Sequence, residues 1–96
     1  MKAVLEFVGY FRMKTGCGFL EAEFKDEDVT ILDLIVQAEE ILSARDFKVL
    51  SGMKLKDGVL LFIRNENGGL KRIFKLSTAL REIGEHVIIA NLMGGG

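Results

Sequence analysis

Hydrophobic and polar residues alternate at the beginning of the chain. The apolar positions of residues 2–11 that share one face are Ala3, Leu5 and Phe7. Alternation of this kind is typical of a strand with one buried face. Residues 14–18 contain two glycines and indicate a turn, and residues 19–24 alternate again. We therefore predict an amino-terminal hairpin of two strands.

The pattern then changes to a helical spacing. Thr30 and Asp33 resemble a capping box, with Asp in place of the usual Glu. Apolar residues recur every three or four positions after it, at Ile31, Leu34, Ile35, Ala38, Ile41 and Leu42. Gln37, Glu39 and Glu40 lie away from this stripe. The spacing predicts a helix that ends near Arg45 and packs one face on a sheet.

The second half of the chain reads as strands joined by turns. Residues 47–56 have no clear period and predict an irregular connection with a short extended piece. The remaining predicted elements are a strand at 59–63 covered on both faces, a turn at 65–69, a short strand at 70–74, one helical turn at 76–80, a turn at 84–86 and a last strand at 87–92. This order favours an α+β fold in which a mixed sheet of about five strands packs on one main helix, the β-grasp arrangement.

Composition and charge limit the classes of function. The 96 residues are enough for one domain with a single core, so we predict one unit over residues 1–96. The net charge of −1 gives no reason to expect nucleic acid or a membrane surface as a partner. No stretch approaches the roughly 20 apolar residues of a membrane span. Cys17 is the only cysteine and cannot form an internal disulfide, and no secretory signal is recognised, which favours the cytoplasm.

The last residues carry the clearest chemical signal. An apolar strand-like run passes directly into Gly94, Gly95 and Gly96. Glycine lacks a Cβ, so a glycine segment can lie in a narrow channel of an enzyme. A carboxylate presented in this way can be activated as an acyl-adenylate and then attacked by sulfide, a thiolate or an amine. The alternative is an incidental, frayed end.

Three segments resemble a known family in the correct order along the chain. Residues 8–16, Val-Gly-Tyr-Phe-Arg-Met-Lys-Thr-Gly, are similar to the first-strand signature of the ubiquitin-like sulfur-carrier proteins. Residues 76–85 resemble the family segment Leu-x-Thr-x-Leu-x-x-Gly-Asp, with Ile83 as one extra residue. Residues 87–96 match its last strand and diglycine tail. Within this family the chain is most similar to the small subunit of molybdopterin synthase.

The resemblance implies a carrier that has no catalytic groups or bound cofactor of its own. A ubiquitin-activating-type enzyme would use ATP to adenylate the Gly96 carboxylate, with Gly95 completing the functional pair. A thiocarboxylate would follow, and its sulfur would be delivered to the large subunit of molybdopterin synthase or to another acceptor. The family usually has Pro-Pro before its tail, whereas this chain has Asn91-Leu92. That departure weakens the molybdopterin assignment more than the carrier assignment.

Several other residues are candidates for partner binding or chemistry. An apolar patch would combine Phe62, Ile73, Leu92, Met93 and Gly94, although core packing accounts for the first three equally well. Arg12, Lys71, Arg72 and Arg81 either steer an acidic partner or belong to a solvated surface. Cys17 is interpreted as an incidental cysteine of an exposed turn, and His86 as a solvated turn residue without further metal ligands.

Two other classes of function remain open. The chain is also consistent with a protein modifier whose Gly96 forms an isopeptide bond to target lysines, because archaeal relatives of this fold serve both purposes. It is equally consistent with a plain β-grasp interaction domain in which the tail is incidental. Tail-dependent conjugates would be expected only for the modifier, and insensitivity to loss of Gly95 and Gly96 only for the plain domain.

Overall fold

Two antiparallel strands open the fold, as the alternating pattern predicts. The computed structural model describes residues 1–92, and within it β1 spans Lys2–Phe7 and β2 spans Phe19–Glu23. Leu5 lies opposite Leu20 across the pair. The side chains that alternate inward from β1 are fully buried, namely Ala3, Leu5 and Phe7. The predicted hairpin is therefore confirmed, but its connection is not a simple turn.

The first strand is shorter than predicted, because the chain leaves the sheet after Phe7 and forms helix α1, Tyr10–Thr15. Gly16 ends this helix with φ +72°, a left-handed conformation that suits glycine, and its N–H donates to the Arg12 carbonyl. Phe11 packs edge-on against Phe47 with the ring centroids 5.6 Å apart. Burial of Phe11 beside the end of the sheet thus replaces the predicted extension to residue 11.

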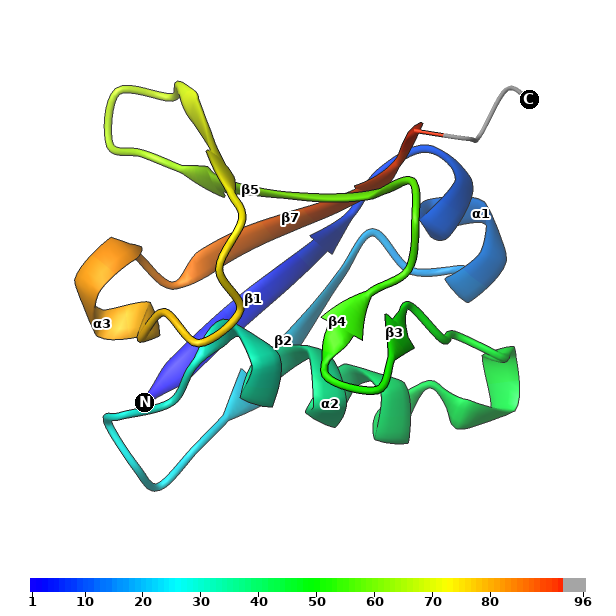
Figure 1. Cartoon of the computed structure of the whole chain (residues 1–96), viewed down its shortest axis with the longest axis horizontal. Helices are drawn as coiled ribbons and strands as arrows, with labels where there is room; N and C mark the ends of the chain where they lie inside the picture. The colour runs from blue at the N-terminus through cyan, green and yellow to red at the C-terminus, as the bar shows by residue number, and fades with distance from the viewer. Residues whose placement is uncertain (93–96) are drawn as a thin grey trace.

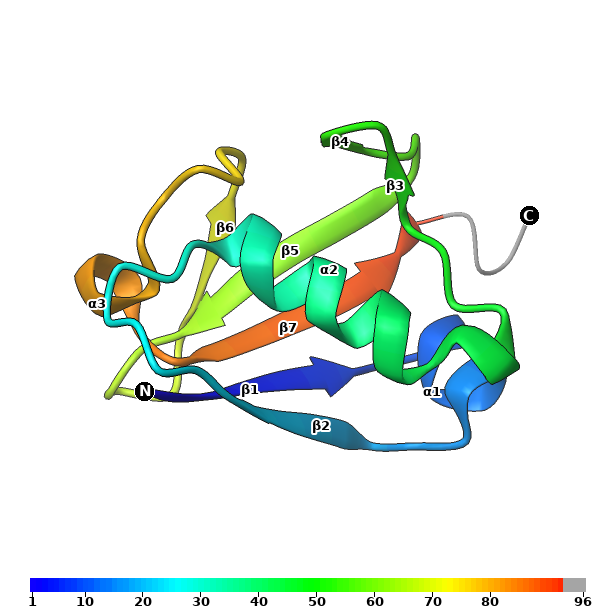
Figure 2. The same cartoon turned by 90° about the horizontal axis from the view of Figure 1, so that it is seen from below.

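The predicted capping box begins the main helix. Helix α2 spans Ile31–Ile41 and continues into a 3-10 turn, η1, at Ser43–Arg45. The Asp33 N–H donates to Thr30 Oγ1 at 3.2 Å, and the Thr30 N–H donates to the Asp33 carboxylate at 3.0 Å. The buried stripe consists of Ile31, Leu34, Ile35 and Ala38. In Figure 2, α2 crosses one face of the sheet, as the helical spacing predicts.

The sheet has five strands in the order β2-β1-β7-β5-β6. Strand β5 spans Val59–Arg64, β6 spans Leu70–Ile73 and β7 spans His86–Asn91. β7 is parallel to β1 and antiparallel to β5, so the sheet is mixed (Figure 1). Leu60 and Phe62 of β5 are only half-buried, so the prediction that this strand is covered on both faces is wrong. The hydrophobic core lies between α2 and the face of the sheet that α2 covers.

The connection after α2 is irregular, as predicted, and contains two short paired strands. These are β3, Leu50–Ser51, and β4, Lys54–Leu55. The Glu39 carboxylate of α2 accepts from the backbone N–H groups of Val49 at 2.8 Å and Leu50 at 3.0 Å. This side chain attaches the connection to the main helix, a role that its position outside the apolar stripe does not reveal.

The predicted helical turn at 76–80 is wrong. Helix α3 begins later and spans Leu80–Ile83, while the residues before it run beside the start of α2. The Ile31 N–H donates to the Thr78 carbonyl at 3.1 Å, and the Leu32 N–H donates to the Leu76 carbonyl at 3.0 Å. The first N–H groups of a helix have no partner within it. The segment forms a turn, in which the Thr78 N–H donates to the Lys75 carbonyl at 3.2 Å, and its carbonyls supply those partners.

Candidate functional site

The strand that leads to the glycines is the central strand of the sheet. β7 pairs with β1 on one side, where Phe7 lies opposite Ile89, and with β5 on the other, where Val59 lies opposite Asn91. Just beyond it, the Leu92 N–H donates to the Gly58 carbonyl at 2.6 Å. Main-chain bonds hold β7 on both sides as far as Ile89, and the β5 side continues them to Leu92. The segment that follows therefore begins at a rigid point.

The predicted tail residues Met93, Gly94, Gly95 and Gly96 lie outside the described residues, so their roles remain predictions. Leu92 is the last described residue, and its side chain is 74% exposed. A hollow of 320 Å³ lies beside the end of β7 and is lined by Asn91 and by three lysines, Lys14, Lys48 and Lys56, with two aspartates among its other residues. The base of the tail thus lies among mixed charges with one excess positive group.

The predicted apolar patch does not form as a single surface. Phe62 lies opposite Arg72 across β5 and β6, whereas Ile73 lies opposite Leu61. Successive side chains of a strand point to opposite faces, so Phe62 and Ile73 face different sides of the sheet. Ile73 is 8% exposed and belongs to the core under α2. Its prediction as a partner-binding residue is wrong, while Phe62 keeps a half-buried position on the face turned away from α2.

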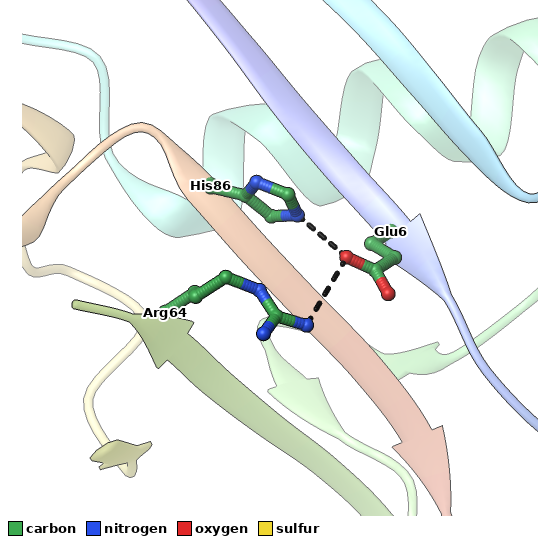
Figure 3. Close-up of polar contacts among 3 residues, drawn as sticks. All are labelled: Glu6, Arg64 and His86. Carbon is green, nitrogen blue, oxygen red and sulfur yellow. Dashed lines mark hydrogen bonds and ion pairs between the residues drawn. The ribbon is translucent and has the colours of Figure 1, made fainter. Parts of the chain in front are cut away.

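A polar cluster lies on this same face, which we call the open face and define by Glu6, Phe62, Arg64, His86 and Ile88. His86 Nε2 lies 2.6 Å from Glu6 Oε1, and an Arg64 guanidinium nitrogen lies 3.7 Å from the same oxygen (Figure 3). The three side chains come from β7, β1 and β5, which are neighbours in the sheet. His86 is therefore a paired strand residue, and its interpretation as a solvated turn residue is wrong.

Solved structures decide the fold. No protein-family model matches the sequence, and no curated protein matches it significantly. SAMP1 from Haloferax volcanii superposes with a TM-score of 0.76 over all of both chains at 16% identity. The HVO 2177 protein from the same organism gives 0.63 at 15% identity, over all of this chain and 87% of that chain. The chain has the β-grasp fold.

The other candidate residue of this β-grasp protein, Cys17, is half-buried rather than fully exposed in its turn. Its Sγ lies 3.5 Å from the Thr15 carbonyl, and its N–H donates to Thr15 Oγ1 at 3.2 Å. Thr15 is fully buried and donates to the Phe11 carbonyl at 2.8 Å. Cys17 therefore sits in a hydrogen-bonded turn against the core, which restricts the access of reagents to the thiol.

The part of this β-grasp protein that the structure describes contains no group of three His, Cys, Asp or Glu side chains placed to hold a metal ion. Across residues 1–92, none of the helices is both long enough and apolar enough to cross a membrane.

Proposed function

We propose that this protein is a sulfur carrier that works through the carboxylate of Gly96. The observation that carries the proposal is the position of β7, since the glycines follow the central strand of a β-grasp sheet after only two residues, Leu92 and Met93. A rigid domain can be held by an activating enzyme while a side-chain-free segment reaches the enzyme's active site. The domain would be the part that the enzyme binds, and the tail would carry the reacting carboxylate.

The proposed chemistry has two steps that balance without a redox change. A Gly96 carboxylate oxygen attacks the α-phosphorus of ATP, and pyrophosphate leaves. Hydrosulfide then attacks the carbonyl carbon of the acyl-adenylate, AMP leaves, and the product is a thiocarboxylate. The catalytic groups belong to an adenylating enzyme of the ubiquitin-activating type, because the carrier is the substrate in both steps. Sulfur would then pass to an acceptor, for which the large subunit of molybdopterin synthase is our first candidate.

The residues before the tail differ from the usual Pro-Pro, and the structure suggests how the difference is accommodated. Proline has no backbone N–H and could not make the bond that Leu92 donates to Gly58. In this chain a hydrogen bond, rather than the stiffness of proline, fixes the direction in which the tail starts. The Asn91-Leu92 sequence is therefore compatible with a carrier.

Intact mass spectrometry tests the proposal. The full chain is incubated with an adenylating enzyme that is active on another carrier, together with ATP and hydrosulfide, beside a variant lacking Gly95 and Gly96. Exchange of one carboxylate oxygen for sulfur adds about 16 Da, and we expect this gain only on the full chain. Absence of the gain would refute the carrier, and tail-dependent bonds to lysines in cells would favour the protein modifier instead.

A further inference from the structure

A second surface lies away from β7 and its tail. A groove of 550 Å³ opens where the first turn of α2, the β3–β4 hairpin and the chain after β6 meet. Its apolar lining consists of Leu32, Met53, Leu55, Phe74 and Leu76. Met53 at the hairpin tip is 74% exposed, and Phe74 after β6 is 79% exposed. Two large apolar side chains therefore stay in water at the rim of one groove, an arrangement typical of a binding surface.

Positive charge surrounds this groove without internal neutralisation. Lys54 and Lys75 line it, and Lys71 and Arg72 belong to the adjoining strand β6. The Arg72 guanidinium lies over the Phe74 ring, 4.8 Å from its centroid. Within residues 1–92, ion pairs involve other cationic groups, and none of these four reaches a carboxylate within the distance of a salt bridge. Of these, Lys54 and Lys75 line the groove and are available there to an external anion.

We propose that this groove binds an extended acidic segment of a partner protein that carries apolar anchor side chains. The floor is apolar and would bury the anchors, and the unbranched, polarisable Met53 can adapt to their shape. Carboxylates between the anchors would meet Lys54 and Lys75. A nucleic acid presents phosphates along its whole length and fits the charges but not the apolar floor, and the net charge of −1 gives it no general attraction.

The proposal is independent of the carrier chemistry. Every residue that lines the groove lies between positions 32 and 77, outside β7 and the tail. A chain without Gly95 and Gly96 should therefore bind the same segment with unchanged affinity. Failure of thiocarboxylate formation would refute the proposed function and would not affect the proposal for the groove. Failure of the groove to bind the segment would refute the groove proposal and would not affect the proposed function.

The probe is a random peptide library displayed on phage and selected against the full chain. We expect the enriched peptides to combine Asp or Glu with Leu, Ile, Phe or Met. A synthetic enriched peptide is then titrated by fluorescence anisotropy. The double variant Lys54→Glu/Lys75→Glu should weaken its binding about tenfold or more, because two attractive charge contacts become repulsive. Met53→Ser should also weaken binding, through loss of apolar contact.

The matched control is Lys25→Glu/Lys48→Glu, which reverses two exposed charges away from the groove and should leave the affinity within about twofold. Thermal unfolding followed by circular dichroism verifies that both double variants are folded. Three results would overturn the proposal: no enriched peptide, enriched peptides without acidic residues, or equal weakening by the two double variants. Loss of binding in the tail-deleted chain would overturn it as well, because the site would then include the tail.

Discussion

Single carboxylates join segments of this fold through polar contacts that add to the hydrophobic core. Glu39 on α2 accepts two backbone N–H groups from the connection that follows the helix. Glu6 on β1 contacts His86 and Arg64 from two other strands. In both cases the partners lie outside the element that carries the carboxylate, and one oxygen atom contacts two of them. The first contact attaches the connection to the main helix, and the second links three neighbouring strands on the open face.

Replacement of Glu39 by Ala tests the first of these contacts. The change leaves the N–H groups of Val49 and Leu50 without their acceptor, so we expect the free energy of unfolding to fall by about 1–3 kcal/mol. Urea denaturation measures the loss. Glu40→Ala is the matched control, since it makes the same substitution at an exposed neighbouring position of α2. Equal effects of the two substitutions would show that the bonds contribute nothing.

The opposite orientations of Phe62 and Ile73 give a second prediction. Ile73→Asp places a carboxylate in the core, which costs several kcal/mol, so we expect little folded protein. Phe62→Asp places the same group on the open face, where water reaches it, and the protein should remain folded. Circular dichroism and the dispersion of amide proton shifts measure both. A folded Ile73→Asp protein would contradict the assignment of Ile73 to the core.

At the scale of elements, segments far apart in sequence complete each other's backbone hydrogen bonds. Residues 76–80 run beside the start of α2, and a bridge joins Thr30 to Ala79. Gly58, at the entry to β5, accepts from Leu92 at the exit of β7. The beginning of the main helix and the end of the central strand therefore both depend on chain segments that carry no regular structure of their own.

Substitution at Leu92 tests the support at the end of β7. Leu92→Pro removes the N–H that donates to Gly58, and we expect a loss of about 0.5–1.5 kcal/mol in the free energy of unfolding. Leu92→Ala keeps the N–H and removes only an exposed side chain, so it should be nearly neutral. Chemical denaturation of the two variants side by side gives the difference. An equal stability would mean that the bond does not support the tail.

The sequence predicted those elements whose signal is local. The capping box of Thr30 with Asp33 and the alternation in residues 19–24 depend on neighbouring residues, and both were confirmed. Helix α1 was missed, although Gly9 and Gly16 bracket it and the buried Phe11 and Thr15 stand four residues apart. The residues before α3 use their carbonyls as acceptors for the first N–H groups of α2. No local pattern therefore predicts where α3 begins.

The predictions for the candidate site divide in the same way, between local signals and contacts that only the assembled fold creates. The prediction for the glycines rests on their order in the chain and stays a prediction, whereas strand parity alone could have separated Phe62 from Ile73 once the register was known. The Glu6, Arg64 and His86 cluster joins strands 80 residues apart at its widest, a contact that only the assembled sheet creates. The groove beside Met53 and Phe74 likewise needs three segments in place.

For the molecule as a whole, β7 holds the two halves of the sheet together. The order β2-β1-β7-β5-β6 leaves β1–β2 on one side and β5–β6 on the other, with the last strand between them. Val87 and Ile89 of this strand are fully buried beside Leu5 and Leu61. Loss of β7 would separate two antiparallel pairs and open the core.

Amide hydrogen exchange should reflect this arrangement. We expect the slowest exchange in the paired amides of β1, β5 and β7, because opening them requires the sheet to separate. Amides of the edge strands β2 and β6 that point away from the sheet should exchange faster. Exchange followed by two-dimensional NMR measures both groups. Protection of the outward amides of β6 equal to that of β7 would indicate that another surface covers the edge.

The central place of β7 also has a consequence during synthesis. When a ribosome has released residues 1–85, the nascent chain holds β1–β2 and β5–β6, two pairs that share no ladder in the finished sheet. Closure of the sheet must await residues 86–91, which come two residues before the glycines. A translation product that stops early is consequently an unfolded target for proteases. The five-stranded sheet is therefore complete only after its last described strand has been synthesised.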